Sequence, residues 1–283
     1  MKSANEAIFI VKVRCQNRPG IIHQLTKTVL ELKGDILEFD QFTLHEEEFM
    51  CRIEFTTNSK RNESEIRTSF NSFIKKNTAN LTVVKAQNKL EMGILVSNHS
   101  HCLAELLYQY SVNRLSVNIP FIISNHPIHE AVCKYYNIPF YHIDISSDDK
   151  GEGEILEIIR DQSDFLVLAR YMQVLSSNFI QLYNNDIINV HHSLLPSFKG
   201  GNPYQQAYNY GVKLIGATSH FVTEALDEGP IIEQDTVQIN HRHSVADIKQ
   251  SGHWIEKKVL ADTCRLYAQN RIIRGKSQTV VFK

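Results

Sequence analysis

The 283-residue chain is long enough for two domains of ordinary size, each able to bury a hydrophobic core. Hydrophobic residues make up 42% of it and charged residues 22%, as in a typical globular protein, and the formal net charge is −1. A nucleic-acid partner would require a basic excess that releases counterions, so we expect a small-molecule ligand and no nucleic acid.

Residues 1–84 are predicted to form the first domain. Apolar periodicity changes between two and about 3.6 residues along this stretch, which indicates alternating strands and helices. The order is strand, helix, strand, strand, helix, strand, at residues 8–13, 21–32, 36–44, 48–55, 64–75 and 81–84. This βαββαβ order predicts a ferredoxin-like fold.

The turn after the first strand reads Asn17-Arg18-Pro19-Gly20, and with its surroundings it resembles the ACT domain, a regulatory module that often binds amino acids. The resemblance implies an amino-acid effector near Gly20. Because ACT-like modules commonly pair edge to edge, it also implies a homo-oligomer. Related modules often read C-P-D before this turn, whereas this chain reads Cys15-Gln16-Asn17, so an amide replaces a carboxylate where an effector would bind.

Polar residues 85–91 are the predicted linker, and residues 92–283 the predicted catalytic domain. Short apolar runs there alternate with helical segments at 102–110 and up to 135. The runs lie at 93–97, 119–124, 165–169, 186–190 and 214–222. This alternation predicts an α/β domain with a doubly wound, mostly parallel sheet, whose site lies at the carboxyl ends of the strands.

Cysteine and histidine spacing bounds the chemistry further. The five cysteines are odd in number and have no C-x-x-C spacing, which argues against a disulfide framework and favours a reduced cytoplasmic compartment. No apolar run has the length of a signal peptide or membrane span, so we expect no membrane partner. The pairs His99/His101 and His241/His243 lack cysteine or carboxylate partners at ligand spacing, so we expect no metal.

The candidate catalytic residues are Asn189, His191 and Asp227. Asn189 and His191 stand two apart at the end of a buried strand, so both side chains should project to the same side. Asp227 precedes the turn formers Gly229-Pro230, which can hold it rigidly. Attack on a carbonyl carbon requires donors for the oxyanion, which Asn189 and His191 can supply, and a base, which Asp227 can supply.

Spacing alone leaves a structural alternative open for these residues. A single Asn or His at a strand end is commonly a hydrogen-bonding residue of the fold, and an Asp before Gly-Pro commonly forms a turn. No G-x-S-x-G elbow or catalytic cysteine motif is present. If the site is catalytic, the pattern favours one-step addition and elimination without a covalent intermediate.

Two longer motifs add a resemblance to folate-dependent formyltransferases. Residues 189–200 read NVHHSLLPSFKG and resemble the family motif N-x-H-x-S-L-L-P-x-F-x-G; residues 220–232 read HFVTEALDEGPII and resemble its second motif. The resemblance covers about residues 92–283 and maps the family's catalytic trio onto Asn189, His191 and Asp227. It implies a folate pocket, with core packing as the alternative for the first two of its residues. The implied pocket residues are Tyr171, Met172, Gln173, Leu175, His192, His220 and Glu224.

Three features resemble the deformylases of this family rather than its transferases. Residues 97–102 have no glycine, so the loop that cradles a phosphate in the glycinamide ribonucleotide transferase is missing. The chain reads His191-His192-Ser193 where transferases read H-P-S, and an ACT-like domain precedes the catalytic domain. Residues 201–208 resemble the deformylase loop G-x-R-P-Y-x-Q-A-Y, with Asn202 in place of arginine; Asn98 replaces a lysine common in the family.

The deformylase resemblance implies that 10-formyltetrahydrofolate is the substrate, that water is the acceptor, and that no cofactor is needed. Asn189 and His191 would then hold the oxyanion while Asp227 takes the proton of water. His192 has two open roles, placing the water or packing beneath the loop. A formyltransferase acting on an amine and a non-catalytic folate-binding sensor remain the alternative functions.

Overall fold

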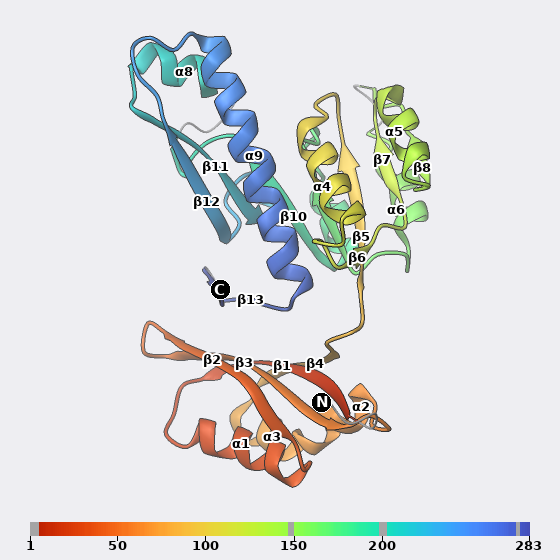
Figure 1. The fold of residues 1–283 in the computed structure, drawn as a ribbon, viewed down its shortest axis with the longest axis vertical. Coiled ribbons are helices and arrows are strands. Elements are labelled where there is room, and N and C mark those ends of the chain that lie inside the picture. Colours follow the sequence, from red (N-terminus) through yellow and green to blue (C-terminus); the bar gives the residue numbers. More distant parts are fainter. Residues whose placement is uncertain (1–5, 147–149, 198–202, 276–277) are drawn as a thin grey trace. The chain divides into compact units, whose positions relative to one another are not determined.

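The computed structural model describes residues 6–146, 150–197, 203–275 and 278–283. The chain forms two compact units, one made of residues 1–88 with 269–283 and the other of residues 89–268 (Figure 1). The sequence-based division differs in one respect, because it assigned residues 269–283 to the second domain. The observed break between the units, at residues 88–89, lies inside the predicted linker.

The first unit has the ferredoxin-like fold that its sequence predicts. Its elements are β1 (Glu6–Gln16), α1 (Ile21–Glu31), β2 (Asp35–Leu44), β3 (Glu48–Asn58), α2 (Glu63–Ser69), α3 (Asn71–Asn77) and β4 (Asn80–Lys85). The strands form one antiparallel sheet in the order β2-β3-β1-β4. The predicted single helix over 64–75 is two short helices that meet at Phe70, which is fully buried in the core.

Residues 269–283 join the first unit through a C-terminal hairpin of β13 (Ile272–Arg274) and β14 (Thr279–Val281). Its apolar side chains form a small core with Met50 of β3, and Arg271 pairs with Glu38 of β2 at 2.9 Å. The side chain of Arg14 also donates to the carbonyl of Arg274 at 3.2 Å. Both an apolar cluster and charged contacts therefore hold this segment on the first unit.

The second unit begins with β5, and strands and helices alternate along most of it. They are β5 (Leu90–Val96), α4 (His101–Ser111), β6 (Val117–Asn118), β7 (Ile122–Ser124), η1 (Pro127–His129), α5 (Glu130–Tyr135), β8 (Phe140–His142), α6 (Glu152–Ile159), β9 (Phe165–Leu168), α7 (Ser177–Tyr183), β10 (Asp186–His191), α8 (Pro203–Tyr210), β11 (Leu214–Phe221), β12 (Ile231–Gln238) and α9 (Val245–Ala268).

The sheet of the second unit runs β12-β11-β10-β9-β5-β7-β8, and its pairs are parallel except those of β11, which is antiparallel to both β10 and β12. Side chains of β9 alternate between its two faces, as a strand requires. Leu166 and Leu168 enter a core with α6 and α7, whereas the ring of Phe165 packs 4.5 Å from that of Tyr267 on α9. Helices therefore cover both faces, which confirms the predicted doubly wound, mostly parallel sheet.

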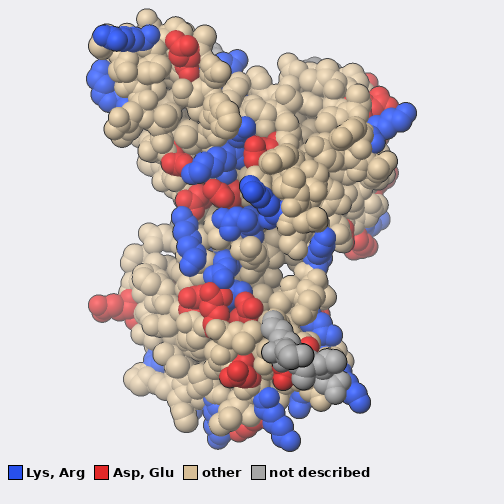
Figure 2. All heavy atoms as spheres, in the orientation of Figure 1, with Lys and Arg blue, Asp and Glu red and all other residues tan. Residues whose placement is uncertain are grey.

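Helix α9 has 24 residues and packs against α4, β11 and β12. Its sequence does not show a plain amphipathic stripe, since Trp254 is 62% exposed while Glu256 is 0% exposed. In the part of the chain that the structure describes, no helix combines the length and apolarity required to cross a membrane. Basic and acidic side chains are interspersed on the face drawn in Figure 2, in keeping with the nearly balanced charge.

Candidate active site

A cavity of about 740 Å³ opens in the second unit beside the ends of β9 and β10. Its floor comes from these two strands, and the loops after β9 and β11 form its sides. Every residue of the second unit that the sequence predicted for the site lines this one cavity. Those residues are Asn189, His191, Asp227, Tyr171, Met172, Gln173, Leu175, His192, His220 and Glu224. Their roles stay predictions, because their placement alone does not assign a role.

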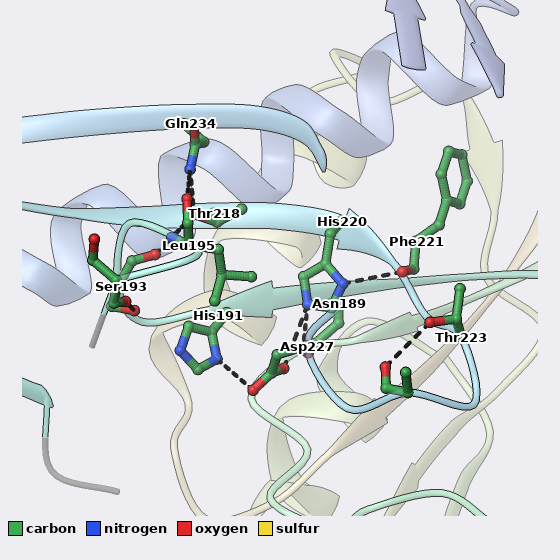
Figure 3. A network of polar contacts seen from close by, with 12 residues as sticks. Asn189, His191, Ser193, Leu195, Thr218, His220, Phe221, Thr223, Asp227 and Gln234 are labelled. Carbon is green, nitrogen blue, oxygen red and sulfur yellow. Dashed lines mark hydrogen bonds and ion pairs between the residues drawn. The ribbon is translucent and has the colours of Figure 1, made fainter. Parts of the chain in front are cut away.

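Asn189 and His191 project to the same side of β10, as the alternation of a strand requires (Figure 3). His191 Nδ1 lies 3.2 Å from Asp227 Oδ2, and the two side chains are 6% and 14% exposed. The other ring nitrogen of His191, Nε2, is buried without a hydrogen-bond partner among the described residues. A buried polar atom left without a partner is costly, so this nitrogen is a candidate contact for a ligand atom.

His220 lies opposite Asn189 in the β10–β11 ladder and is 2% exposed. Its Nδ1 is 3.0 Å from the carbonyl oxygen of Phe221, so this nitrogen carries a proton and donates. Asn189 Nδ2 and Asp227 Oδ1 then both face His220 Nε2, at 3.2 Å and 3.6 Å. Only the shorter is a hydrogen-bond distance, and there the Asn189 amide donates to His220 Nε2. The second N–H of that amide is left to face the cavity.

Asp227 is held in an unusual backbone conformation, with φ at 55°, in the loop between β11 and β12. The loop closes through a bond from the Phe221 N–H to the carbonyl of Pro230 at 3.0 Å, and a Cβ at Gly229 would overlap the Phe221 carbonyl oxygen. The hydrogen bond from His191 holds the pKa of Asp227 well below its usual range. Asp227 is therefore a fixed, ionised carboxylate.

A second group of polar contacts fixes the chain that follows β10 (Figure 3). The fully buried hydroxyl of Thr218 accepts from the Leu195 N–H at 3.0 Å and donates to the Ser193 carbonyl at 2.8 Å. Gln234 on β12 donates to both Thr218 and the Leu195 carbonyl. Side chains of β11 and β12 thus hold residues 193–197. Residues 198–200, the remainder of the first motif, lie outside the described residues, and so does Asn202.

The loop after β9 holds four residues of the predicted folate pocket: Tyr171, Met172, Gln173 and Leu175. Tyr171 is 6% exposed and packs in the core of the unit, whereas Met172 is 54% exposed. Both line the cavity, so core packing and contact with a ligand are compatible for Tyr171. The Met172 N–H donates to Ser97 Oγ at 3.0 Å, and the exposed Glu224 accepts from Gln181 at 2.9 Å.

His192 is half-buried, and its ring centroid lies 5.0 Å from that of His191 and 5.9 Å from that of Tyr204. Burial, followed by the charge of Arg170, lowers its pKa to about 3. His192 is therefore neutral at physiological pH. It lines the cavity and also packs, so both roles left open by the sequence are compatible with its place.

Sequence reasoning missed a buried charged cluster that includes the cavity-lining residue Arg170. Glu256 Oε2 on α9 lies 3.2 Å from Arg170 Nε and 2.9 Å from His101 Nε2, and Tyr204 donates its hydroxyl proton to the other carboxylate oxygen. Gly252, one turn earlier, leaves room for the Tyr204 ring, since a Cβ there would overlap it. Burial opposes ionisation of Glu256, but the bond from His101 and the charge of Arg170 lower its pKa to about 2. The available signal was the charged Arg170, which stands between the apolar run 165–169 and the predicted pocket residue Tyr171.

The same cluster bears on the predicted absence of a metal. The ligand atoms of His101, His253 and Glu256 lie within 4.8 Å of one another, so a carboxylate does stand beside an H-x-H pair. The spacing of residues in the sequence did not reveal this carboxylate, because Glu256 lies on α9, far along the chain from His101. Arg170 beside Glu256 repels a cation, and the absence of a required metal stays a prediction.

Comparison with known proteins places this geometry in a family. Residues 91–264 match the formyl transferase family. The chain is 38% identical to a formyltetrahydrofolate deformylase of Bacillus subtilis, over 99% of this chain and 96% of the relative, and 40% identical to a mitochondrial one of Arabidopsis thaliana, over 95% and 86%.

Solved structures show the same relation. A formyltetrahydrofolate deformylase of Pseudomonas syringae aligns with a TM-score of 0.94 at 34% identity, covering 99% of this chain and 96% of that one. A phosphoribosylglycinamide formyltransferase of Anaplasma phagocytophilum aligns with a TM-score of 0.64 at 30% identity, over 69% of this chain and 96% of its own. The match over nearly the whole length is with the deformylases, and the chain belongs to the formyltetrahydrofolate deformylase family.

Proposed function

We propose that this chain hydrolyses 10-formyltetrahydrofolate to tetrahydrofolate and formate in the cavity of its second unit. The reaction joins water to a neutral formyl carbon and expels N10, so the site must stabilise an oxyanion and move one proton from water to N10. Both needs are met by groups that converge on one cavity, Asn189, His191 and Asp227. Membership in the deformylase family supplies the identity of the substrate.

The oxyanion would be stabilised by donors on β10. The free N–H of the Asn189 amide and Nε2 of His191 face the formyl oxygen from the same side of the strand. His191 donates through Nε2 in its imidazolium form, and the Asp227 carboxylate 3.2 Å from Nδ1 compensates the charge of that form. These donors are held in place before substrate arrives, so little reorganisation is needed during the reaction.

Asp227 would act as the base toward water. Its Oδ2 contacts His191, which leaves Oδ1 to accept the proton. A carboxylate with a lowered pKa is a weak base toward free water, so we infer that the transfer is late, after C–O bond formation has acidified the water. The same carboxyl group then delivers the proton to N10 as the C–N bond breaks.

The observation that carries this proposal is the contact of His191 with Asp227, combined with a second His191 nitrogen that is buried and unpaired among the described residues. The test is to incubate purified protein with 10-formyltetrahydrofolate in water and measure formate. We expect formate without an amine acceptor. Formate formation only after an amine is added would favour the transferase, and no turnover with any acceptor would favour a folate-binding sensor.

We propose that the first unit regulates or assembles the enzyme. Gly20 stands at a φ of 86°, which favours glycine, and lines a 210 Å³ pocket with residues 17–22 of the turn and three residues of β2 and β3. This pocket is the candidate site for an amino acid such as glycine or methionine. Because residues 269–283 belong to the same unit, cutting the chain at 85 would strip their partner sheet, so the full chain should be titrated. Unchanged kinetics and oligomeric state with every amino acid would contradict an effector role.

A homo-oligomer is part of this proposal, since the sheet of the first unit has edge strands, β2 and β4, that can pair with a second copy. A reducing compartment such as the cytoplasm is also part of it. All five cysteines are free and buried, which is the state expected of thiols that are not exposed to oxidative pairing. Light scattering would test the oligomer.

A further inference from the structure

The cavity is also lined by a buried arginine whose function the hydrolytic mechanism leaves open. Arg170 follows β9, is 7% exposed and has a φ of 63°, a conformation that is uncommon outside glycine. Such outliers persist only where the surrounding structure holds them, and they cluster at functional sites. Arg170 lines the cavity together with His99 and Lys249.

Arg170 is anchored from one side only. Its Nε lies 3.2 Å from Glu256, and this ion pair is its one polar side-chain contact with the described residues. The two terminal nitrogens of the guanidinium are left as a planar fork of donors, which is the geometry that matches a carboxylate. Glu256 is itself not part of the cavity lining, so its charge compensates Arg170 from behind.

The neighbouring titratable groups do not compete with Arg170 for an anion. Burial, followed by the Arg170 charge, lowers the pKa of His99, and His192 is also neutral. Glu256 stays ionised because His101, Arg170 and Tyr204 stabilise its charge. The arginine and lysine side chains that line the cavity are Arg170 and the exposed Lys249, which has no acidic partner within the described part of the chain.

The charge balance of the reaction points to an occupant. The formyl group enters neutral; C–O bond formation and C–N cleavage release a carboxylate, while one proton of water goes to N10 and another to solvent. The new anion arises beside the ionised Asp227, which repels it, in a cavity that Arg170 also lines. We propose that Arg170, with Lys249 at the rim, forms a carboxylate subsite that receives formate as it leaves the formyl carbon. This inference rests on the proposed function, since formate is the product of that reaction.

A carboxylate could also come from the glutamyl tail of the folate itself. Both sources offer the same planar pair of oxygens, so the fork of Arg170 cannot distinguish them by shape. They differ in connection, because the tail is covalently attached to the substrate and formate is not. An experiment with free formate and with a substrate that lacks the glutamyl group separates them.

The test is a titration of the folate-free enzyme with sodium formate, followed by calorimetry or by NMR of ¹³C-formate, with sodium chloride at equal ionic strength as the reference. We expect specific binding with a Kd on the order of 1 mM, near the tightest possible for a ligand of three non-hydrogen atoms. Arg170→Gln should weaken it roughly tenfold or more, because a charge-assisted pair is lost. Lys257→Gln is the matched control: it removes a cation of α9 that pairs with Glu105 and does not line the cavity.

A second substitution guards against a failure of the Arg170 variant to fold. Arg170→Gln leaves Glu256 buried without its cation, so the double variant Arg170→Gln with Glu256→Gln removes both charges together. Formate binding by this double variant at the wild-type affinity, or no binding by the wild type, would overturn the subsite. Neither result depends on turnover, so failure of the subsite and failure of the proposed hydrolysis are distinguishable.

Kinetics identify the source of the carboxylate. If formate is the occupant, Arg170→Gln weakens product inhibition by formate and changes KM equally for substrates with and without the glutamyl group. If the KM effect disappears once the glutamyl group is removed, the tail is the occupant and the assignment to formate is wrong.

Discussion

Two ionised carboxylates belong to this site and its supporting residues, and their surroundings differ. Asp227 lies on a loop, 14% exposed, and lines the cavity; Glu256 lies on α9, 0% exposed, behind the lining. Both have a lowered pKa, yet for different reasons. A hydrogen bond from His191 stabilises the charge of Asp227, whereas an arginine, a histidine and a tyrosine surround that of Glu256.

The difference shows how a perturbed carboxyl group should be interpreted. A carboxylate whose oxygens are all satisfied by protein groups, as in Glu256, has none left for a reacting molecule, so it positions its neighbours. Asp227 keeps one oxygen 3.6 Å from His220, beyond hydrogen-bond distance, and that oxygen faces the cavity. A lowered pKa alone would not have separated the two.

The largest expected effect is on the Asp227 side. Asp227→Asn keeps the shape but removes the base and the charge that compensates His191, so kcat should fall by about 10²–10⁴. Formate release measured at fixed times would show this fall in kcat, and folate binding would be measured separately. Asp235→Asn, which breaks an ion pair with Lys258 outside the cavity, is the control. Near-normal turnover of Asp227→Asn would show that another group is the base.

The pH profile sharpens the same point. Asp227 is active when ionised, and its lowered pKa keeps it ionised through about pH 5–8, so kcat/KM should not fall on its account over that range. Loss would begin only as pH falls toward the depressed pKa of Asp227. An acid limb near pH 6 that disappears in Asp227→Asn would contradict this ordering.

The next effect concerns the oxyanion. Asn189→Ala removes one donor, and such losses cost about 10²–10³ in kcat, with a smaller change in KM. Asn185→Ala, which removes a bond to the Ser163 carbonyl just before β10, serves as the control because it does not line the cavity. If Asn189→Ala raised KM and left kcat unchanged, the amide would bind the ground state and not the oxyanion.

Substitution of Glu256 should lower the stability of the fold. Glu256→Gln leaves Arg170 buried without an anion, which costs about 3–5 kcal/mol in the free energy of unfolding. The ionised Glu256 stabilises the fold fully above the pKa of an unfolded glutamate, about 4.3. This stabilisation is lost as pH falls through the folded pKa of about 2, so the difference in unfolding free energy between variant and wild type should shrink over that window. Urea unfolding at several pH values measures it. Glu105→Gln, which breaks the partly exposed pair with Lys257, should cost no more than about 1 kcal/mol.

The smallest expected effect is that of a chelator. Arg170 pairs with Glu256 where a metal would bind, so removal of divalent cations should leave the rate unchanged. Atomic absorption on the purified protein, with turnover before and after treatment, is the measurement. Lost activity that zinc restores would identify His101, His253 and Glu256 as ligands and overturn the view of Glu256 as a positioning residue.

The sequence by itself determined the two fold classes and one half of the site. Periodicities of two and 3.6 residues are local, so they predict strands and helices without knowledge of the rest of the chain. Asn189 and His191 are two apart on one strand, so their common direction follows from the pleat alone. Asp227 could be assigned because its turn formers and the second motif stand beside it, and the structure then brings it to 3.2 Å from His191.

Only the tertiary structure decided the other half. His101 meets Glu256 across 155 residues and Tyr204 meets it across 52, and no local pattern encodes such pairs. On α9 the exposed Trp254 and the buried Glu256 reverse the usual placement, because the neighbouring elements supply an arginine, a histidine and a tyrosine that stabilise a buried charge. For the same reason the place of residues 269–283 could not be predicted, since their partner side chains lie on β2 and β3, far away in the sequence.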